Sequence, residues 1–90
     1  MNRETGELET DIEKATLACL TAVEAIVEEA GGAKENLAKL TVLVRDIGQF
    51  SKINAVYADF FGDHKPARAL FEVSALPKDA VIEIEAYAII

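Results

Sequence analysis

The stretch that decides the fold is residues 38–61, AKLTVLVRDIGQFSKINAVYADFF. Residues 38–45 alternate as a strand does, and both faces of that strand carry apolar side chains, which is typical of the middle of a sheet. From Asp46, which can cap a helix, apolar residues recur at steps of three and four until Gly62. This periodicity predicts a helix with an apolar stripe, and Asn54 lies at the edge of that stripe. The stripe consists of Ile47, Phe50, Ile53, Tyr57, Phe60 and Phe61.

The flanking segments predict three further elements. Thr10 and Glu13 have the spacing of a capping box and open a helix that ends about residue 30, where two glycines follow. Residues 67–73 and 80–90 alternate as strands, so the predicted order is α-β-α-β-β and the fold class is α+β. The face of the first helix that we expect to be buried consists of Ile12, Ala15, Cys19, Val23, Ile26 and Ala30.

Two helices can cover only one face of a three-stranded sheet. If the last two strands form a hairpin, Arg68 falls near Glu85 and Leu70 falls near Glu83 on the uncovered face. An apolar patch of this size is rarely left in water, so we expect a partner chain to cover it. The predicted uncovered face consists of Leu43, Leu70, Val81, Tyr87 and Ile89 mixed with Arg45, Arg68, Glu72, Glu83 and Glu85.

Composition limits the classes of function. The 90 residues suffice for one domain. The hydrophobic share of 51% is a first hint of a buried subunit interface, although an Ala-rich helical protein would give a similar figure. The net charge of −7 and the scattered basic residues argue against nucleic-acid binding. A single cysteine, Cys19, excludes an intrachain disulfide and a thiolate zinc site. Neither a leader peptide nor a membrane-spanning run is visible, which favours a cytoplasmic location.

Several motifs together resemble the YjgF/RidA family, the enamine/imine deaminases once labelled endoribonuclease L-PSP or translation inhibitors. The motifs are ETGEL at 4–8, VEEAGG at 27–32, VRDIGQFSKINAVYADFF at 44–61, PAR at 66–68 and EVSALPKDAVIEIEA at 72–86. This resemblance covers nearly the whole chain. It implies a chorismate-mutase-like fold and a homotrimer with clefts between subunits. It also implies a single domain over residues 1–90 that lacks the family's N-terminal strands.

The resemblance further implies the reaction and the site. The family hydrolyses reactive 2-imino or enamine acids, such as 2-aminoacrylate, to 2-keto acids and ammonia without metal or cofactor. Arg68 matches the arginine that binds the substrate carboxylate, and Glu83 matches the acid that positions or activates water. Asn54 matches an asparagine that supports the cleft. The cleft tyrosine and glycine that the family's N-terminal region supplies have no counterpart here, and Leu70 replaces a small polar residue.

The residues also allow simpler interpretations. Arg68 could form an ion pair with Glu85 or Glu72, and Glu83 could be a solvated charge on the sheet. Asn54 is better explained as a structural hydrogen-bonding residue than as a catalytic one. His64 stands alone in a polar loop without the partners of a catalytic triad, and Cys19 is expected to be an inert core residue.

The favoured prediction is therefore a deaminase that binds a small 2-imino or 2-keto acid at Arg68. A first alternative is a catalytically impaired relative that serves as an oligomeric carboxylate-binding or regulatory protein. A second alternative is a ribonuclease or translation inhibitor, against which the net charge of −7 argues.

Overall fold

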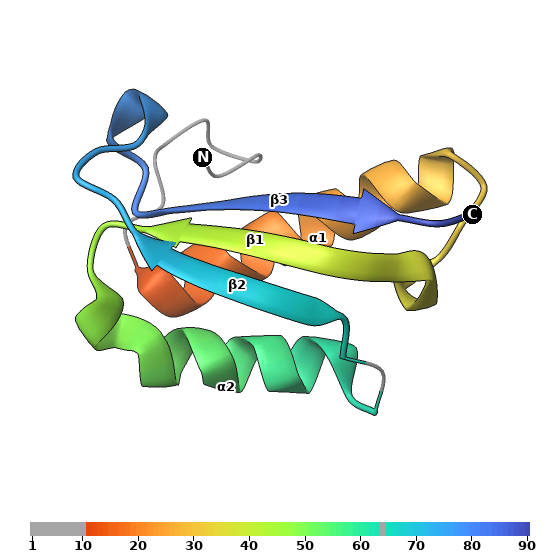
Figure 1. Cartoon of the computed structure of the whole chain (residues 1–90), viewed down its shortest axis with the longest axis horizontal. Helices are drawn as coiled ribbons and strands as arrows, with labels where there is room; N and C mark the ends of the chain where they lie inside the picture. The colour runs from red at the N-terminus through yellow and green to blue at the C-terminus, as the bar shows by residue number, and fades with distance from the viewer. Residues whose placement is uncertain (1–10, 64) are drawn as a thin grey trace.

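The computed structural model describes residues 11–63 and 65–90. It has the predicted order α-β-α-β-β, with two helices packed on a small mixed sheet (Figure 1). Short 3-10 turns at Lys34–Asn36, Ile47–Gln49 and Pro77–Asp79 precede β1, α2 and β3. The helices and strands are α1 (Ile12–Glu29), β1 (Leu37–Val44), α2 (Phe50–Phe61), β2 (Ala67–Glu72) and β3 (Ile82–Ala88).

The sheet has the strand order β2-β1-β3, which confirms that β1 is the central strand. β1 pairs with β2 in parallel and with β3 in antiparallel orientation. Because parallel neighbours need a crossover connection, α2 links β1 to β2 as the helix of a βαβ unit. The expected hairpin between the last two strands is therefore wrong, since β1 lies between β2 and β3. Arg68 is opposite Leu40 of β1, and Glu85 is opposite Thr41.

Both helices cover the same face of the sheet. In Figure 1 α1 passes behind the strands and α2 runs along the side of β2. The core consists of two clusters on this face, and each includes side chains of α1, β1 and α2. Leu40, Val42 and Val44 are at most 1% exposed, as the alternation in β1 predicts.

The buried face of α1 differs in part from the predicted one. Ile12 and Ala15 are buried, but Ile26 is 68% exposed and Ala30 is also exposed. Leu20 and Val27 are buried in their place because they pack with Leu37 and Leu40 of β1 in the second core cluster. Cys19 and Val23 are half-buried at the margin of the core.

The N-terminal cap of α1 is Asp11, whose Oδ2 accepts a hydrogen bond from the Lys14 amide at 2.9 Å. The predicted cap, Thr10, lies outside the described residues. The second predicted cap, Asp46, caps the 3-10 turn Ile47–Gln49 and not α2 itself, because its Oδ1 accepts from the Gly48 amide at 2.9 Å, whereas the N-cap of α2 is Gln49. Gly62 follows the last turn of α2 with a φ of +60°, a conformation that glycine adopts without steric cost.

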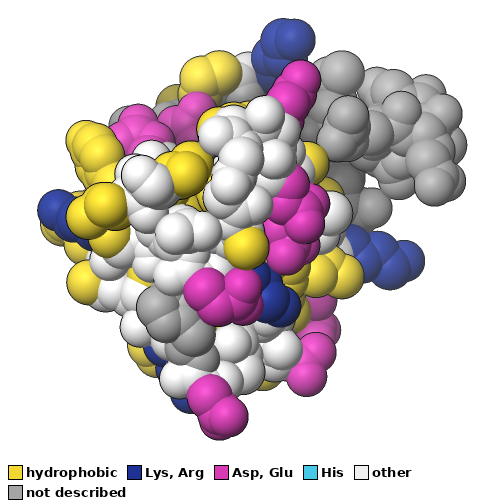
Figure 2. All heavy atoms as spheres, turned by 90° about the vertical axis from the view of Figure 1, so that its right-hand side faces the viewer, with side chains coloured by type: hydrophobic (Ala, Val, Ile, Leu, Met, Phe, Trp, Pro, Cys, Tyr) yellow, Lys and Arg dark blue, Asp and Glu magenta, His cyan; other side chains and the backbone are white. Residues whose placement is uncertain are grey.

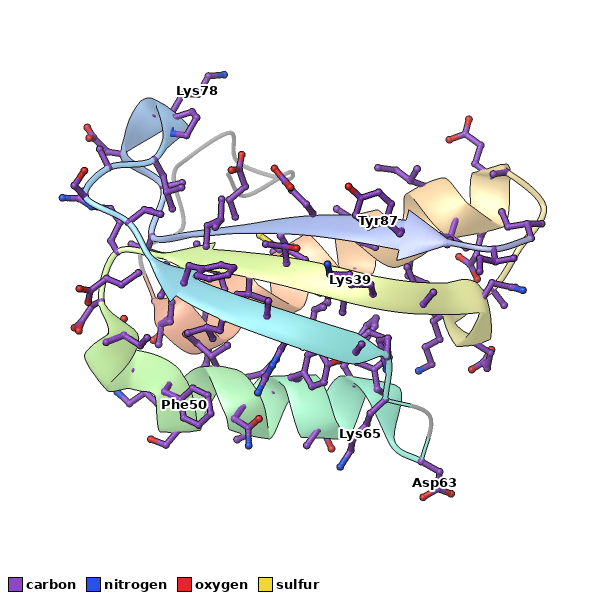
Figure 3. All side chains as sticks on the ribbon, in the orientation of Figure 1. Lys39, Phe50, Asp63, Lys65, Lys78 and Tyr87 are labelled. Atoms are coloured by element: carbon purple, nitrogen blue, oxygen red, sulfur yellow. The ribbon has the colours of Figure 1, made fainter. Side chains whose placement is uncertain are left out.

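The open face of the sheet carries residues that alternate with the core positions. They include Lys39 and Tyr87, which are directly opposite each other and are labelled in Figure 3. Figure 2 shows the molecule from the right-hand side of Figure 1, so the open face of the sheet lies at the left of Figure 2. Hydrophobic side chains gather on that side. Tyr87 is 64% exposed and Phe71 is 54% exposed. The face as a whole consists of Lys39, Thr41, Leu43, Ala67, Ala69, Phe71, Glu83, Glu85 and Tyr87.

The prediction for this face was wrong at several positions. Arg68, Leu70 and Glu72 point to the helix side, because each is opposite a core residue of β1 in the parallel register. Val81 precedes β3 and packs against the first core cluster. Among the described residues, no helix is long and apolar enough to cross a bilayer.

Candidate functional site

Arg68 is held between β2 and α2. Its guanidinium lies over the Tyr57 ring, with 4.6 Å between the guanidinium carbon and the ring centroid, and the Phe50 centroid is 5.5 Å away. Its Nη2 donates a hydrogen bond to Oδ1 of Asn54 at 3.0 Å. The three α2 residues are spaced by four and three positions, so they share one helix face. This face fixes the position of the cation through aromatic contacts and one hydrogen bond.

The positive charge of Arg68 is not balanced by an acid in the described part of the chain. Neither proposed ion-pair partner is in place, because Glu85 lies on the opposite face of the sheet and Glu72 Oε1 accepts from the Ile47 amide at 2.9 Å. Nη1 of Arg68 is buried and makes no hydrogen bond. A buried N–H without an acceptor costs about 1–3 kcal/mol, so an anionic oxygen from a ligand would relieve a local deficit here.

Asn54 is exposed at the edge of the apolar face of α2. Its Oδ1 accepts the hydrogen bond from one edge of the Arg68 guanidinium. Phe50 and Tyr57 were expected only as core residues. Their spacing relative to Asn54 was the signal in the sequence that all three could contact one side chain.

Tyr57 also connects α2 to the segment just before β2 by a hydrogen bond. Its hydroxyl donates a hydrogen bond to the carbonyl oxygen of Pro66 at 2.6 Å, and the residue is 6% exposed. Burial raises the pKa of the Tyr57 hydroxyl, and the nearby Arg68 charge opposes that rise. The phenol therefore stays protonated and keeps donating at neutral pH.

We expect Tyr57→Phe to lower the free energy of unfolding by about 1–2 kcal/mol near neutral pH, because the Pro66 carbonyl loses its partner. Since the folded-state pKa is raised, the contribution of the hydroxyl is present below the ordinary tyrosine pKa of about 10 and is lost as pH rises further. Urea unfolding at several pH values measures both effects. An equally large alkaline loss in native and variant chains would contradict this role.

Glu83 lies in β3 on the open face, opposite Leu43. It is therefore two strands away from Arg68 and on the other side of the sheet. One chain brings Arg68 together with Asn54 but does not bring either to Glu83.

Cys19 is the remaining candidate within the described part of the chain, and it adds no second site. Cys19 is a half-buried free cysteine beside the first core cluster, and burial raises the pKa of its thiol, with a smaller contribution from Glu83. His64 lies outside the described residues. Within residues 11–63 and 65–90, no group of three or more His, Cys, Asp or Glu side chains could hold a metal ion.

Comparison with known proteins agrees with the fold. The family described as Endoribonuclease L-PSP matches residues 1–90. The 2-iminobutanoate/2-iminopropanoate deaminase of Escherichia coli K12 is 44% identical over 92 aligned positions, and the match covers 99% of this chain and 72% of the relative.

Two solved structures show the same arrangement of elements. The YjgF gene product of E. coli has a TM-score of 0.92 and 44% identity, with 98% of this chain and 72% of that chain covered. E. coli TdcF with bound serine has a TM-score of 0.90 and 39% identity, with 96% and 70% covered. The chain belongs to the YjgF/RidA family, also described as Endoribonuclease L-PSP, and has its chorismate-mutase-like fold.

Proposed function

We propose that this protein hydrolyses reactive 2-imino or enamine acids, such as 2-aminoacrylate, to 2-keto acids and ammonia. The observation that carries the proposal is the Arg68 guanidinium, which has a buried unpaired Nη1 and only a neutral hydrogen-bond partner. Such a group favours an anion with two oxygens, and every substrate of this class has a carboxylate. The name of the E. coli deaminase supports the same class of reaction.

The chemistry needs few groups from the protein. The enamine tautomerises to the 2-imino acid, and water then adds to C2 of the imine while a carboxylate accepts a proton from that water. The resulting carbinolamine expels ammonia as the carbonyl forms, so one water is consumed for each 2-keto acid and ammonia released. We assign the carboxylate-binding role to Arg68, the water-positioning role to Glu83 and the support of Arg68 to Asn54.

We also propose that the protein works as a homo-oligomer whose sites are shared between chains. The separation of Arg68 from Glu83 supports this proposal, because the two residues cannot reach one small substrate from the same chain. The exposed Tyr87 and Phe71 on the open face supply apolar surface for the contact. The family resemblance implies that the number of chains is three.

A coupled assay tests the reaction. A pyridoxal-phosphate dehydratase generates 2-aminoacrylate from serine, and we expect this protein to accelerate the release of ammonia and pyruvate above the spontaneous rate. The Asn54→Ala variant should retain part of that acceleration, because Arg68 keeps its contacts with the two rings. Control reactions omit either the dehydratase or this protein.

The absence of acceleration by a folded oligomer would refute the proposed reaction. If that oligomer still binds a 2-keto acid, the protein is a carboxylate-binding relative without catalysis. This second function needs only Arg68, whose buried Nη1 has no hydrogen-bond partner. Ribonuclease activity has no such support, since the net charge of −7 opposes binding to RNA.

A further inference from the structure

Glu72 connects the end of β2 to the turn that precedes α2. Its Oε1 accepts a hydrogen bond from the Ile47 amide at 2.9 Å, although the two residues are 25 positions apart in the sequence. Ile47 is the first residue of the 3-10 turn, and the first amides of a helical turn have no acceptor within it. Gln49, the N-cap of α2, makes no side-chain capping bond in the described part of the chain. Glu72 therefore caps the start of this helical segment from a neighbouring strand.

Arg68 makes the second contact between the same two elements. Arg68 and Glu72 lie on one face of β2, since both are opposite core residues of β1 in the parallel register. Phe50 directly follows the 3-10 turn, and its ring centroid is 5.5 Å from the Arg68 guanidinium carbon. Figure 3 labels Phe50 at the beginning of α2. The strand thus contacts the start of α2 at two points, Glu72 with Ile47 and Arg68 with Phe50.

The position of Phe50 depends on the turn before it. Its side chain is 44% exposed and lies outside both core clusters of the described residues. Tyr57, the other ring beside Arg68, is 6% exposed and is held by its own hydrogen bond to Pro66. A shift of the turn would consequently move Phe50 away from the guanidinium and leave Tyr57 in place.

We propose that Glu72 is a positioning residue for the anion-binding arginine. Its bond to the Ile47 amide holds the turn, and the turn keeps the Phe50 ring against the Arg68 guanidinium. A side chain that is already ordered loses less conformational entropy when a ligand binds to it. This inference rests on the proposed function, because the placement of Arg68 matters only if Arg68 binds a carboxylate.

The acceptor oxygen of Glu72 is the feature that acts, and its charge contributes little. A strand rises by about 3.3 Å per residue, so the Cα atoms of Arg68 and Glu72 are about 13 Å apart. This separation exceeds the Debye length of about 8 Å at physiological ionic strength. A glutamine at position 72 keeps an acceptor oxygen and loses only the charge, whereas an alanine loses both.

The test is calorimetric titration of the full chain with pyruvate. Glu72→Ala is expected to raise the Kd about three- to tenfold, and Glu72→Gln should restore it to within about twofold of the native value. Glu28→Ala is the matched control, because it removes the same charge from an exposed position of α1. In the coupled assay, Glu72→Ala should raise KM and leave kcat within about twofold, as the loss of uniform carboxylate binding does.

A second variant removes the donor of the same bond. Ile47→Pro deletes the amide hydrogen at the first position of the turn, where proline is tolerated, and Asp46 before it already has extended backbone with φ −139° and ψ 100°. This variant should weaken pyruvate binding as Glu72→Ala does. The double variant should bind no more weakly than either single variant, since both remove one bond.

The outcomes separate this role from the proposed function. Equal Kd values for native, Glu72→Ala and Ile47→Pro chains, each shown by circular dichroism to be folded at the titration temperature, would overturn the positioning role. Equal weakening by Glu72→Gln and Glu72→Ala would overturn it as well, because the charge and not the acceptor would then be responsible. A native chain that is folded but does not bind pyruvate would instead refute carboxylate binding at Arg68, and the inference with it.

Discussion

A mixture of Arg68→Ala and Glu83→Gln chains is expected to recover about a quarter of the native deaminase rate, although each variant alone is inactive. The reason is the separation of the two residues on opposite faces of one sheet. In a mixed oligomer, half of the sites receive Arg68 from a chain that has it. Half of those receive Glu83 from a neighbour that has it. Subunit exchange at equal concentrations followed by the coupled assay measures this recovery.

The control for this experiment is the same mixture in which each variant has been cross-linked before mixing, so that no chains exchange. That sample should stay inactive. Two different affinity tags, purified in sequence, show that the active fraction contains both variants. An inactive mixed oligomer that carries both tags would show that the two residues do not act together across a subunit boundary.

Arg68→Ala is expected to weaken the binding of a short 2-keto acid by about 100-fold, which corresponds to the roughly 3 kcal/mol of a bidentate charge-assisted contact. Arg68→Lys should recover only a small part, because an ammonium group lacks the planar fork. Calorimetric titration with pyruvate measures both variants. Lys65→Ala removes the same charge from an exposed position near the start of β2 and should leave the affinity within about twofold.

The stability of Arg68→Ala separates a ligand-binding role from a structural one. The substitution removes the contacts with Tyr57 and Phe50, but it also removes the buried Nη1 that has no hydrogen-bond partner. These effects oppose each other, so we expect the free energy of unfolding to change by less than about 1 kcal/mol. A large loss of stability together with unchanged pyruvate binding would show that Arg68 serves the fold instead.

The central strand and the second helix could be predicted from the sequence because their signals are local. Alternation with apolar residues on both faces identified β1, and the three-and-four spacing that ends at Gly62 identified α2. The order of the strands in the sheet could not be predicted from local sequence patterns. Proximity in the sequence suggested a hairpin between β2 and β3, whereas the strand–helix–strand order of β1, α2 and β2 forms a parallel unit.

This topological error also decided which face was assigned to Arg68. In a strand, the pairing register determines which side of the sheet each side chain occupies. The assumed hairpin placed Arg68 beside Glu85, and the parallel register with Leu40 places it against Asn54 and Tyr57. Arg68, Glu83 and Asn54 were chosen from family motifs, which identify residues without giving the side of the sheet. Their contacts needed the three-dimensional arrangement.

The position of β1 between a parallel and an antiparallel neighbour has a consequence for synthesis on the ribosome. The unit of β1, α2 and β2 can form while later residues are still inside the exit tunnel. The other edge of β1 can be paired only after β3 has emerged, because β3 follows every other element in the chain. Until then the nascent chain exposes the unpaired edge of β1, its most apolar strand. We therefore expect aggregation through this edge, and the need for a chaperone, to be greatest in this interval.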